Sequence, residues 1–175
     1  MNFYELISRR ESCRNFSSTP VDIALLKDVL EAARLAPSAR NDQPWNFYIV
    51  NSPESVEKVK DGITKLGRNT FAPEVPAYIV ITRNGFDDDS WNPEFPYSHR
   101  YDVFDCGIAS AHVVLAATEK GLSTCMIGWF DDEILKSVCG YEDETALLVF
   151  AIGYAADDKL RNKTRRSIDE VVKVV

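Results

Sequence analysis

The sequence lacks the short motifs that identify nucleotide-binding loops, metal centres and common nucleophiles. Its 8 glycines include no Gly-x-Gly-x-x-Gly, and the nearest approach to a phosphate-binding loop, residues 62–69, lacks the Lys-Ser/Thr ending. The 2 histidines, His99 and His112, lie thirteen positions apart, a spacing that does not suit a metal site. No Gly-x-Ser-x-Gly is present, and no serine or cysteine stands out as a nucleophile. We therefore expect no dinucleotide fingerprint, no P-loop, no metal centre and no catalytic side chain.

Long apolar runs and a secretory leader are absent as well. No run of 18 apolar residues could form a membrane span, and the start, MNFYELISRR, has neither the basic first residues nor the apolar stretch of a signal peptide. The 4 cysteines form no Cys-x-x-Cys pair, so we interpret them as reduced thiols in or near the core. A net charge of −7 argues against nucleic-acid binding, which needs a basic surface. These features predict a cytoplasmic protein with no nucleic-acid partner and no membrane partner.

What the sequence does contain is positive charge concentrated at two points of an acidic chain. RRESCRNF covers residues 9–16 and RNKTRR covers residues 161–166. Together they hold 7 of the 20 lysines and arginines, where an even spread would place about one or two. Such clusters suit an anionic ligand, and the plainer alternative is two solvated patches. Arg10 and Arg14 are four residues apart, so on a helical turn they would point the same way, with Ser12 contributing from a non-helical bend.

Hydrophobic spacing and cap residues predict alternating helices and strands in a single domain, residues 1–175. About four strands in one sheet, with helices around it, indicate the α+β or α/β class. Residues 84–101 form an irregular, aromatic-rich stretch, which is typical of a functional or mobile loop. The expected helices cover residues 3–9, 102–120 and the stretches after Asp22, Ser52, Asp131 and Ser167, and the expected strands cover residues 45–50, 77–82, 122–129 and 146–154.

Three segments in this order resemble the FMN-dependent nitroreductase family. RRESCRNF is similar to the family's Arg-Arg-x-Ser-x-Arg-x-Phe signature, and PSARNDQPWNF is similar to its Pro-Ser-x-x-Asn-x-Gln-Pro-Trp segment. GLSTCMIGWFDD, followed by IGY and KTR, matches the family's later order. The resemblance covers essentially the whole chain. It implies an α+β fold, with a central and mainly antiparallel sheet of about four to five strands surrounded by helices, and a homodimer.

The resemblance also implies which residues hold the flavin. Arginine forks and a serine hydroxyl suit the FMN phosphate, and in the family a backbone N–H at the position of Gly128 reaches the flavin near N5. The family's usual glutamate is absent at this point. Arg68 is an alternative to Asn69 beside the ring. The implied phosphate residues are Arg10, Ser12, Arg14, Lys163 and Arg165; those near the ring are Asn69, Ile127 and Gly128; and those reaching the flavin of the partner subunit are Pro37, Ser38 and Asn41.

The function implied by the resemblance is that of an FMN-dependent oxidoreductase. Hydride from NADH or NADPH would pass through flavin N5 to a small acceptor such as a nitroaromatic or a quinone. A flavin-binding protein without turnover, such as a reservoir or a sensor, is the alternative. In the expected homodimer FMN lies at the interface, and the apolar tail at residues 168–175 packs on the partner unless it is buried on its own sheet.

Three single residues have two interpretations each. Met126 and Trp129 either face the flavin or belong to the core. Asp105 is either a polar neighbour of the flavin or a carboxylate at a helix start, where the helix dipole favours negative charge.

Overall fold

A computed structural model describes residues 1–84 and 101–175 of the chain, so most of the expected aromatic loop, residues 85–100, lies outside the described residues. The helices are α1 (Phe3–Arg9), α2 (Ile23–Arg34), α3 (Pro53–Thr64), α4 (Tyr101–Glu119), α5 (Asp132–Cys139) and α6 (Ile168–Val171), with short 3₁₀ turns η1 (Ala39–Asn41), η2 (Lys65–Gly67) and η3 (Ala72–Glu74); the strands are β1 (Trp45–Val50), β2 (Ala77–Asn84), β3 (Ser123–Ile127) and β4 (Glu144–Gly153).

The helices begin where their cap residues predict. Asp22 accepts a hydrogen bond from the Ala24 N–H at 2.7 Å, and Ser52 accepts one from the Ser55 N–H at 3.3 Å. Each side chain satisfies an N–H that has no partner inside its helix. Asp131 caps α5 in the same way. These local signals confirm the predicted helix starts.

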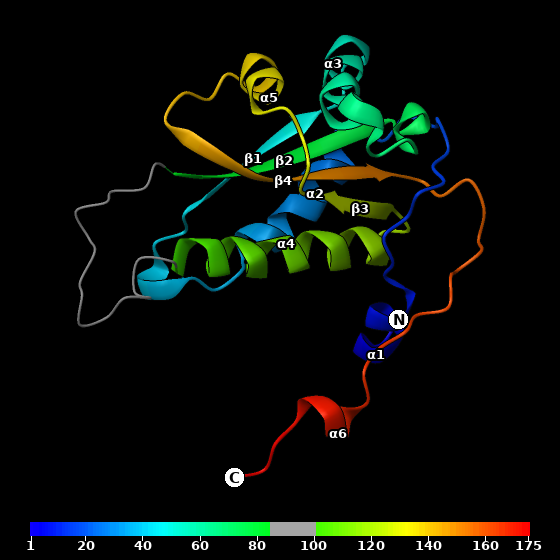
Figure 1. The fold of residues 1–175 in the computed structure, drawn as a ribbon, viewed down its shortest axis with the longest axis vertical. Helices are drawn as coiled ribbons and strands as arrows, with labels where there is room; N and C mark the ends of the chain where they lie inside the picture. The colour runs from blue at the N-terminus through cyan, green and yellow to red at the C-terminus, as the bar shows by residue number, and fades with distance from the viewer. Residues whose placement is uncertain (85–100) are drawn as a thin grey trace.

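The four strands form one antiparallel sheet in the order β1-β2-β4-β3. Helices α2 and α4 cover one face, and α3 and α5 cover the other (Figure 1). Strand β2 is buried on both faces: Ile79 and Ile81 pack toward α2 and α4, while Tyr78 and Val80 pack toward α3 and α5. The predicted α+β fold with an antiparallel sheet is confirmed. Among the described helices, none is long and apolar enough to cross a membrane.

The segment after α1 runs along the free edge of β3. Ser12 forms a parallel bridge with Thr124, and the Cys13 N–H donates to the Thr124 carbonyl at 2.8 Å. Farther on, Phe16 forms an antiparallel bridge with Ala155, just beyond the end of β4. This pairing brings the start of the chain beside the segment that leaves the sheet (Figure 1).

The C-terminal tail leaves the body of the chain. Residues 155–175 are all exposed, including Ile168, Val171 and Val174, so burial of the tail on its own sheet is wrong. Helix α6 is held by a local capping box between Ser167 and Glu170. In Figure 1 the tail extends past α1 and away from the sheet.

Candidate functional site

The two basic segments line one cavity of about 290 Å³. Although about 150 residues separate them in the sequence, the bridge between Ser12 and Thr124 and the course of the tail place them together. The expected convergence is therefore present. The cavity is lined by Arg10, Glu11, Ser12, Arg14, Arg161, Asn162, Lys163, Thr164 and Arg165.

The first segment reaches the cavity as extended chain, which corrects the expected helical turn. Helix α1 ends at Arg9, and Arg10 has φ −53° and ψ 122°, outside the helical region. In extended chain, alternate side chains point to the same side. Arg10, Ser12 and Arg14 all line the cavity, as does Glu11, while Cys13 between them is buried.

Hydrogen bonds that the sequence did not predict join the two basic segments. The Arg161 guanidinium donates to the Ser12 carbonyl, and the Glu11 carboxylate accepts from the Arg161 backbone N–H at 3.1 Å. Lys163 donates to the Ser8 carbonyl at the end of α1. Glu11 looks like part of a solvated charged run in the sequence, so no local signal identified it. These hydrogen bonds hold the arginines of one segment at a fixed distance from those of the other.

The cavity has an excess of positive charge that suits an anion. Among its described lining residues, four are arginines and one is a lysine, whereas Glu11 is the one acidic side chain. Loss of part of its hydration lowers the pKa of the Lys163 ammonium, and the nearby charges of Arg10 and Arg165 lower it further, against an opposing effect of Glu11. A bound dianion would relieve this repulsion and supply acceptors for guanidinium groups. The arrangement fits a phosphate group.

The loop after α2 is held in a strained conformation. Arg40, Asn41 and Gln43 have φ values of 52°, 60° and 46°, in the left-handed region that non-glycine residues seldom adopt. The buried Asp105 carboxylate accepts from the Ala39 N–H at 3.0 Å. Strained residues that are held in place by surrounding contacts often occur at functional sites. Asp105 is the fifth residue of α4, beyond its first turn, so its expected place at the helix start is wrong. It instead fixes the loop that carries Pro37, Ser38 and Asn41.

This loop and the basic cavity lie at opposite ends of α4. The loop touches Asp105 near the start of the helix, whereas the segment that lines the cavity follows α1 and pairs with the start of β3, beside the other end of α4 (Figure 1). Helix α4 has 19 residues, which at about 1.5 Å per residue span about 28 Å. A single chain thus does not bring Pro37, Ser38 and Asn41 to Arg10 and Arg14.

The end of β3 presents an open backbone. The strand stops at the buried Ile127, two residues before the expected end, so Gly128 lies beyond the sheet and is exposed. Met126 and Trp129 are 44% and 36% exposed, so their assignment to the core of this chain is wrong. A Cβ built on Gly128 would have only an ordinary contact with Leu148 Cδ2, at 3.8 Å. A planar group could therefore approach the Gly128 backbone closely.

Asn69 lies beside this backbone. Its amide nitrogen donates to Ile63 O at 2.8 Å and to Trp129 O at 3.4 Å. Arg68 next to it is exposed. Asn69 thus lies just beyond the end of β3, and its amide donors are used within the chain.

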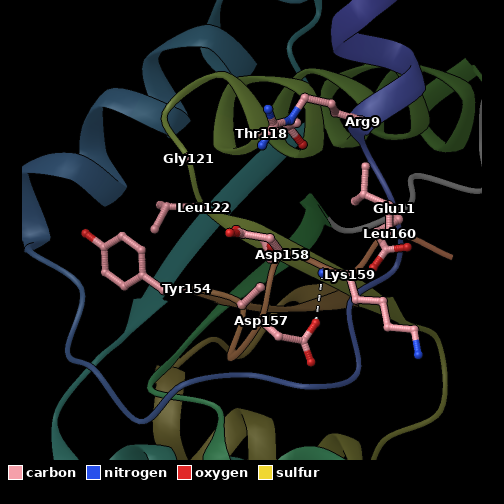
Figure 2. A pocket seen from close by; sticks show the side chains of 12 residues that line it. Arg9, Glu11, Thr118, Gly121, Leu122, Tyr154, Asp157, Asp158, Lys159 and Leu160 are labelled. Carbon is pink, nitrogen blue, oxygen red and sulfur yellow. Dashed lines mark hydrogen bonds between the residues drawn. The ribbon is translucent and has the colours of Figure 1, made fainter.

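A second cavity of about 240 Å³ lies beside α1 and the end of α4 (Figure 2). Arg9 lies next to Thr118 on one side of it, and Asp157 accepts from the Lys159 backbone N–H on the other. Arg9 therefore lines a cavity other than the one that holds Arg10 and Arg14. The two neighbouring arginines have different surroundings.

None of the four thiols has the surroundings of a nucleophile. Burial raises the pKa of Cys106 to about 12 and that of Cys139 to about 11, with nearby carboxylates adding to both shifts. Burial also raises the pKa of Cys13 and Cys125. All four are free thiols, three of them buried, which confirms the interpretation of the cysteines. Within the described part of the chain there is no group of three or more potential metal ligands.

Comparison with known proteins agrees with this geometry. The sequence profile described as "Nitroreductase family" matches residues 7–66 and 55–154. A protein of Archaeoglobus fulgidus, whose name proposes an NADH dehydrogenase/NAD(P)H nitroreductase, is 29% identical over 160 residues, covering 89% of this chain and 86% of that protein. The iodotyrosine dehalogenase 1 homolog of Caenorhabditis elegans is 26% identical over 199 residues, covering 98% of this chain and 61% of that protein.

A solved structure has the same fold at lower sequence identity. It is that of a proposed nitroreductase from Exiguobacterium sibiricum in complex with FMN, with a TM-score of 0.84 and 20% identity, covering 100% of this chain and 98% of the other. Together with the profile match over most of the chain, the fold settles the relationship. The protein belongs to the nitroreductase family.

Proposed function

We propose that this protein is an FMN-dependent oxidoreductase that takes hydride from NADH or NADPH and reduces a small acceptor such as a nitroaromatic or a quinone. The observation that carries the proposal is the cavity in which two distant basic segments meet with a single carboxylate among its described lining. The FMN named for the Exiguobacterium sibiricum structure and the NAD(P)H in the name of the Archaeoglobus fulgidus protein support this assignment.

The chain supplies binding and orientation, and the cofactor supplies the redox chemistry. Arg10, Arg14 and Arg165 hold the phosphate, with Ser12 and Lys163 as further donors. Gly128 offers a backbone N–H to the ring, with Ile127 behind it in the core. When bound, FMN would supply the redox chemistry, namely uptake of hydride at N5 and transfer of electrons to the acceptor.

The site is completed by a second copy of the chain. Pro37, Ser38 and Asn41 lie at the far end of α4 from the basic cavity, so we assign them to the flavin of the partner subunit. Apolar surface on α1, α4 and the tail supports a homodimer, since patches of this kind mark interaction sites. The exposed apolar side chains on these elements include Phe3, Tyr4, Ile7, Tyr101, Val103, Phe104, Ile108, Leu160, Ile168, Val171, Val172, Val174 and Val175.

Gly128→Ala is expected to weaken FMN binding while leaving the fold intact. The new Cβ makes only the contact with Leu148, and the φ of Gly128 lies outside the left-handed region. The unfolded chain loses entropy, so the apo-protein keeps its stability or gains about 0.4–1 kcal/mol. The methyl group stands where the ring approaches, and we expect the Kd for FMN to rise about tenfold, equivalent to about 1.4 kcal/mol.

Flavin titration and thermal unfolding of the apo-protein measure the two effects of Gly128→Ala separately. Gly153→Ala is the matched control, because its Cβ would lie 2.6 Å from Pro76 Cγ and should lower stability. An unchanged Kd in a normally stable Gly128→Ala protein would show that the ring lies elsewhere.

Anaerobic reduction tests the proposed activity. The purified protein is expected to be yellow, or to become so with added FMN, and to bleach when NADH or NADPH is added. Re-oxidation by a quinone then completes the cycle. A yellow protein that neither nicotinamide bleaches would instead be a reservoir or a sensor, and a colourless protein that takes up no FMN would exclude both functions.

A further inference from the structure

The last carbonyls of α3 hold the turn at residues 128–131, which joins β3 to α5. A helix leaves its last four carbonyls without partners inside the helix. In α3, Gly62 O accepts from the Asp131 N–H at 3.1 Å, and Ile63 O accepts from Asn69 Nδ2 at 2.8 Å. The end of α3 is therefore an anchor both for the turn and for Asn69.

Asn69 connects this anchor to the turn a second time. Its Nδ2 also donates to Trp129 O at 3.4 Å, so both of its contacts are with backbone carbonyls. The amide must then present its nitrogen to them, because an amide oxygen has no hydrogen to donate. Asn69 has a φ of 46°, which asparagine adopts more readily than most residues. The backbone conformation of Asn69 and the hydrogen bonds of its side-chain amide therefore favour the same orientation of the residue.

Gly128 lies between two fixed points as a result. On one side, Ile127 is the last residue of β3 and pairs with Val149. On the other side, the Trp129 carbonyl is held by Asn69. A glycine backbone is otherwise unusually free to rotate. The backbone is thus held on both sides of Gly128, by the pairing of Ile127 and by the contact at Trp129.

We propose that Asn69 is a positioning residue, which orients the Gly128 peptide through the Trp129 carbonyl, and that it is not a direct ligand of the flavin. The inference rests on the proposed function, in which the Gly128 N–H faces the ring. Lys65, just after α3, also holds the turn at residues 128–131, through an ion pair with Asp131 at 2.5 Å. That pair is largely exposed at Lys65, so it should contribute less than the amide.

Two substitutions at Asn69 isolate its amide donors. Asn69→Gly removes both hydrogen bonds and accepts a positive φ, while Asn69→Asp keeps the shape and removes the donors. In the apo-protein we expect the Asp131 amide, which donates to Gly62 O, to exchange with solvent about tenfold faster in both variants, with the β2 and β4 amides unchanged. Lys65→Ala, the matched control, should change this exchange little. Exchange of the Asp131 amide at the wild-type rate in both Asn69 variants would overturn the proposal without any use of FMN.

The FMN-loaded protein tests whether the attachment matters for the cofactor. Loss of a hydrogen bond that orients a donor should raise the Kd for FMN about three- to tenfold in both variants and shift the flavin midpoint potential. Faster exchange with an unchanged Kd and an unchanged potential would mean that Asn69 is merely structural, and would overturn the positioning role. A wild-type protein that binds no FMN would refute the proposed function and the positioning role together, while the exchange data would still report whether the attachment exists.

Discussion

Arg14→Ala and Arg165→Ala should each weaken FMN binding about 10- to 150-fold, because a hydrogen bond to a charged group contributes about 1.5–3 kcal/mol. Both side chains line the basic cavity, one from each end of the chain. Riboflavin has the same ring and no phosphate, so it should bind the wild-type protein poorly and be little affected by either substitution. Titration of apo-protein with the two ligands measures the difference.

Arg9→Ala and Arg166→Ala are the matched controls in this experiment. Arg9 lines the second cavity, and the Arg166 guanidinium donates to the Glu170 carbonyl of α6 at 2.7 Å. Each substitution removes the same charge one residue away from a proposed ligand, so the Kd for FMN should change much less. Because FMN binds only the folded protein, it should also raise the midpoint of thermal unfolding, and by less in the Arg14 and Arg165 variants. Equal wild-type affinity for FMN and riboflavin would rule out a phosphate site in this cavity.

Phe104→Glu should convert a dimer into monomers and reduce FMN binding more than 100-fold. Phe104 is 65% exposed on α4, among the apolar side chains that the proposed interface would cover. A carboxylate buried there without a partner costs several kcal/mol, about 2.7 kcal/mol corresponding to a factor of 100. The loss of FMN is expected because, in the proposed homodimer, Pro37, Ser38 and Asn41 reach the flavin from the other subunit.

Sedimentation measures the molecular mass of the assembly that each variant forms, and a flavin titration of the same samples measures binding. Ile23→Glu is the matched control, since Ile23 is 47% exposed at the start of α2, away from the Asp105 end of α4. That variant should remain dimeric and yellow. A Phe104→Glu monomer that retains FMN with wild-type affinity would show that one chain makes the whole site.

Local sequence determined the elements of this protein. Asp22 and Ser52 cap their helices because the hydrogen bonds run to N–H groups two or three residues away. Strand β1 matches its expected range, residues 45–50, because apolar and β-branched residues specify buried strands without distant partners. The two basic clusters could also be recognised from charge alone. Interactions over a few residues can be predicted from sequence because the chain itself keeps the partners close.

Only the tertiary structure decided how these elements form a site. The conformation of the Arg10–Arg14 stretch changed from an expected helical turn to extended chain, because Ser12 pairs with the edge of β3. Asp105 became the support of the strained loop, and Asn69 became a link between α3 and the turn at residues 128–131, through partners 66 and 60 residues away. Whether the cavity binds FMN stays a prediction. Such contacts depend on which backbone groups the packed sheet leaves unpaired, and no local pattern in the sequence records that.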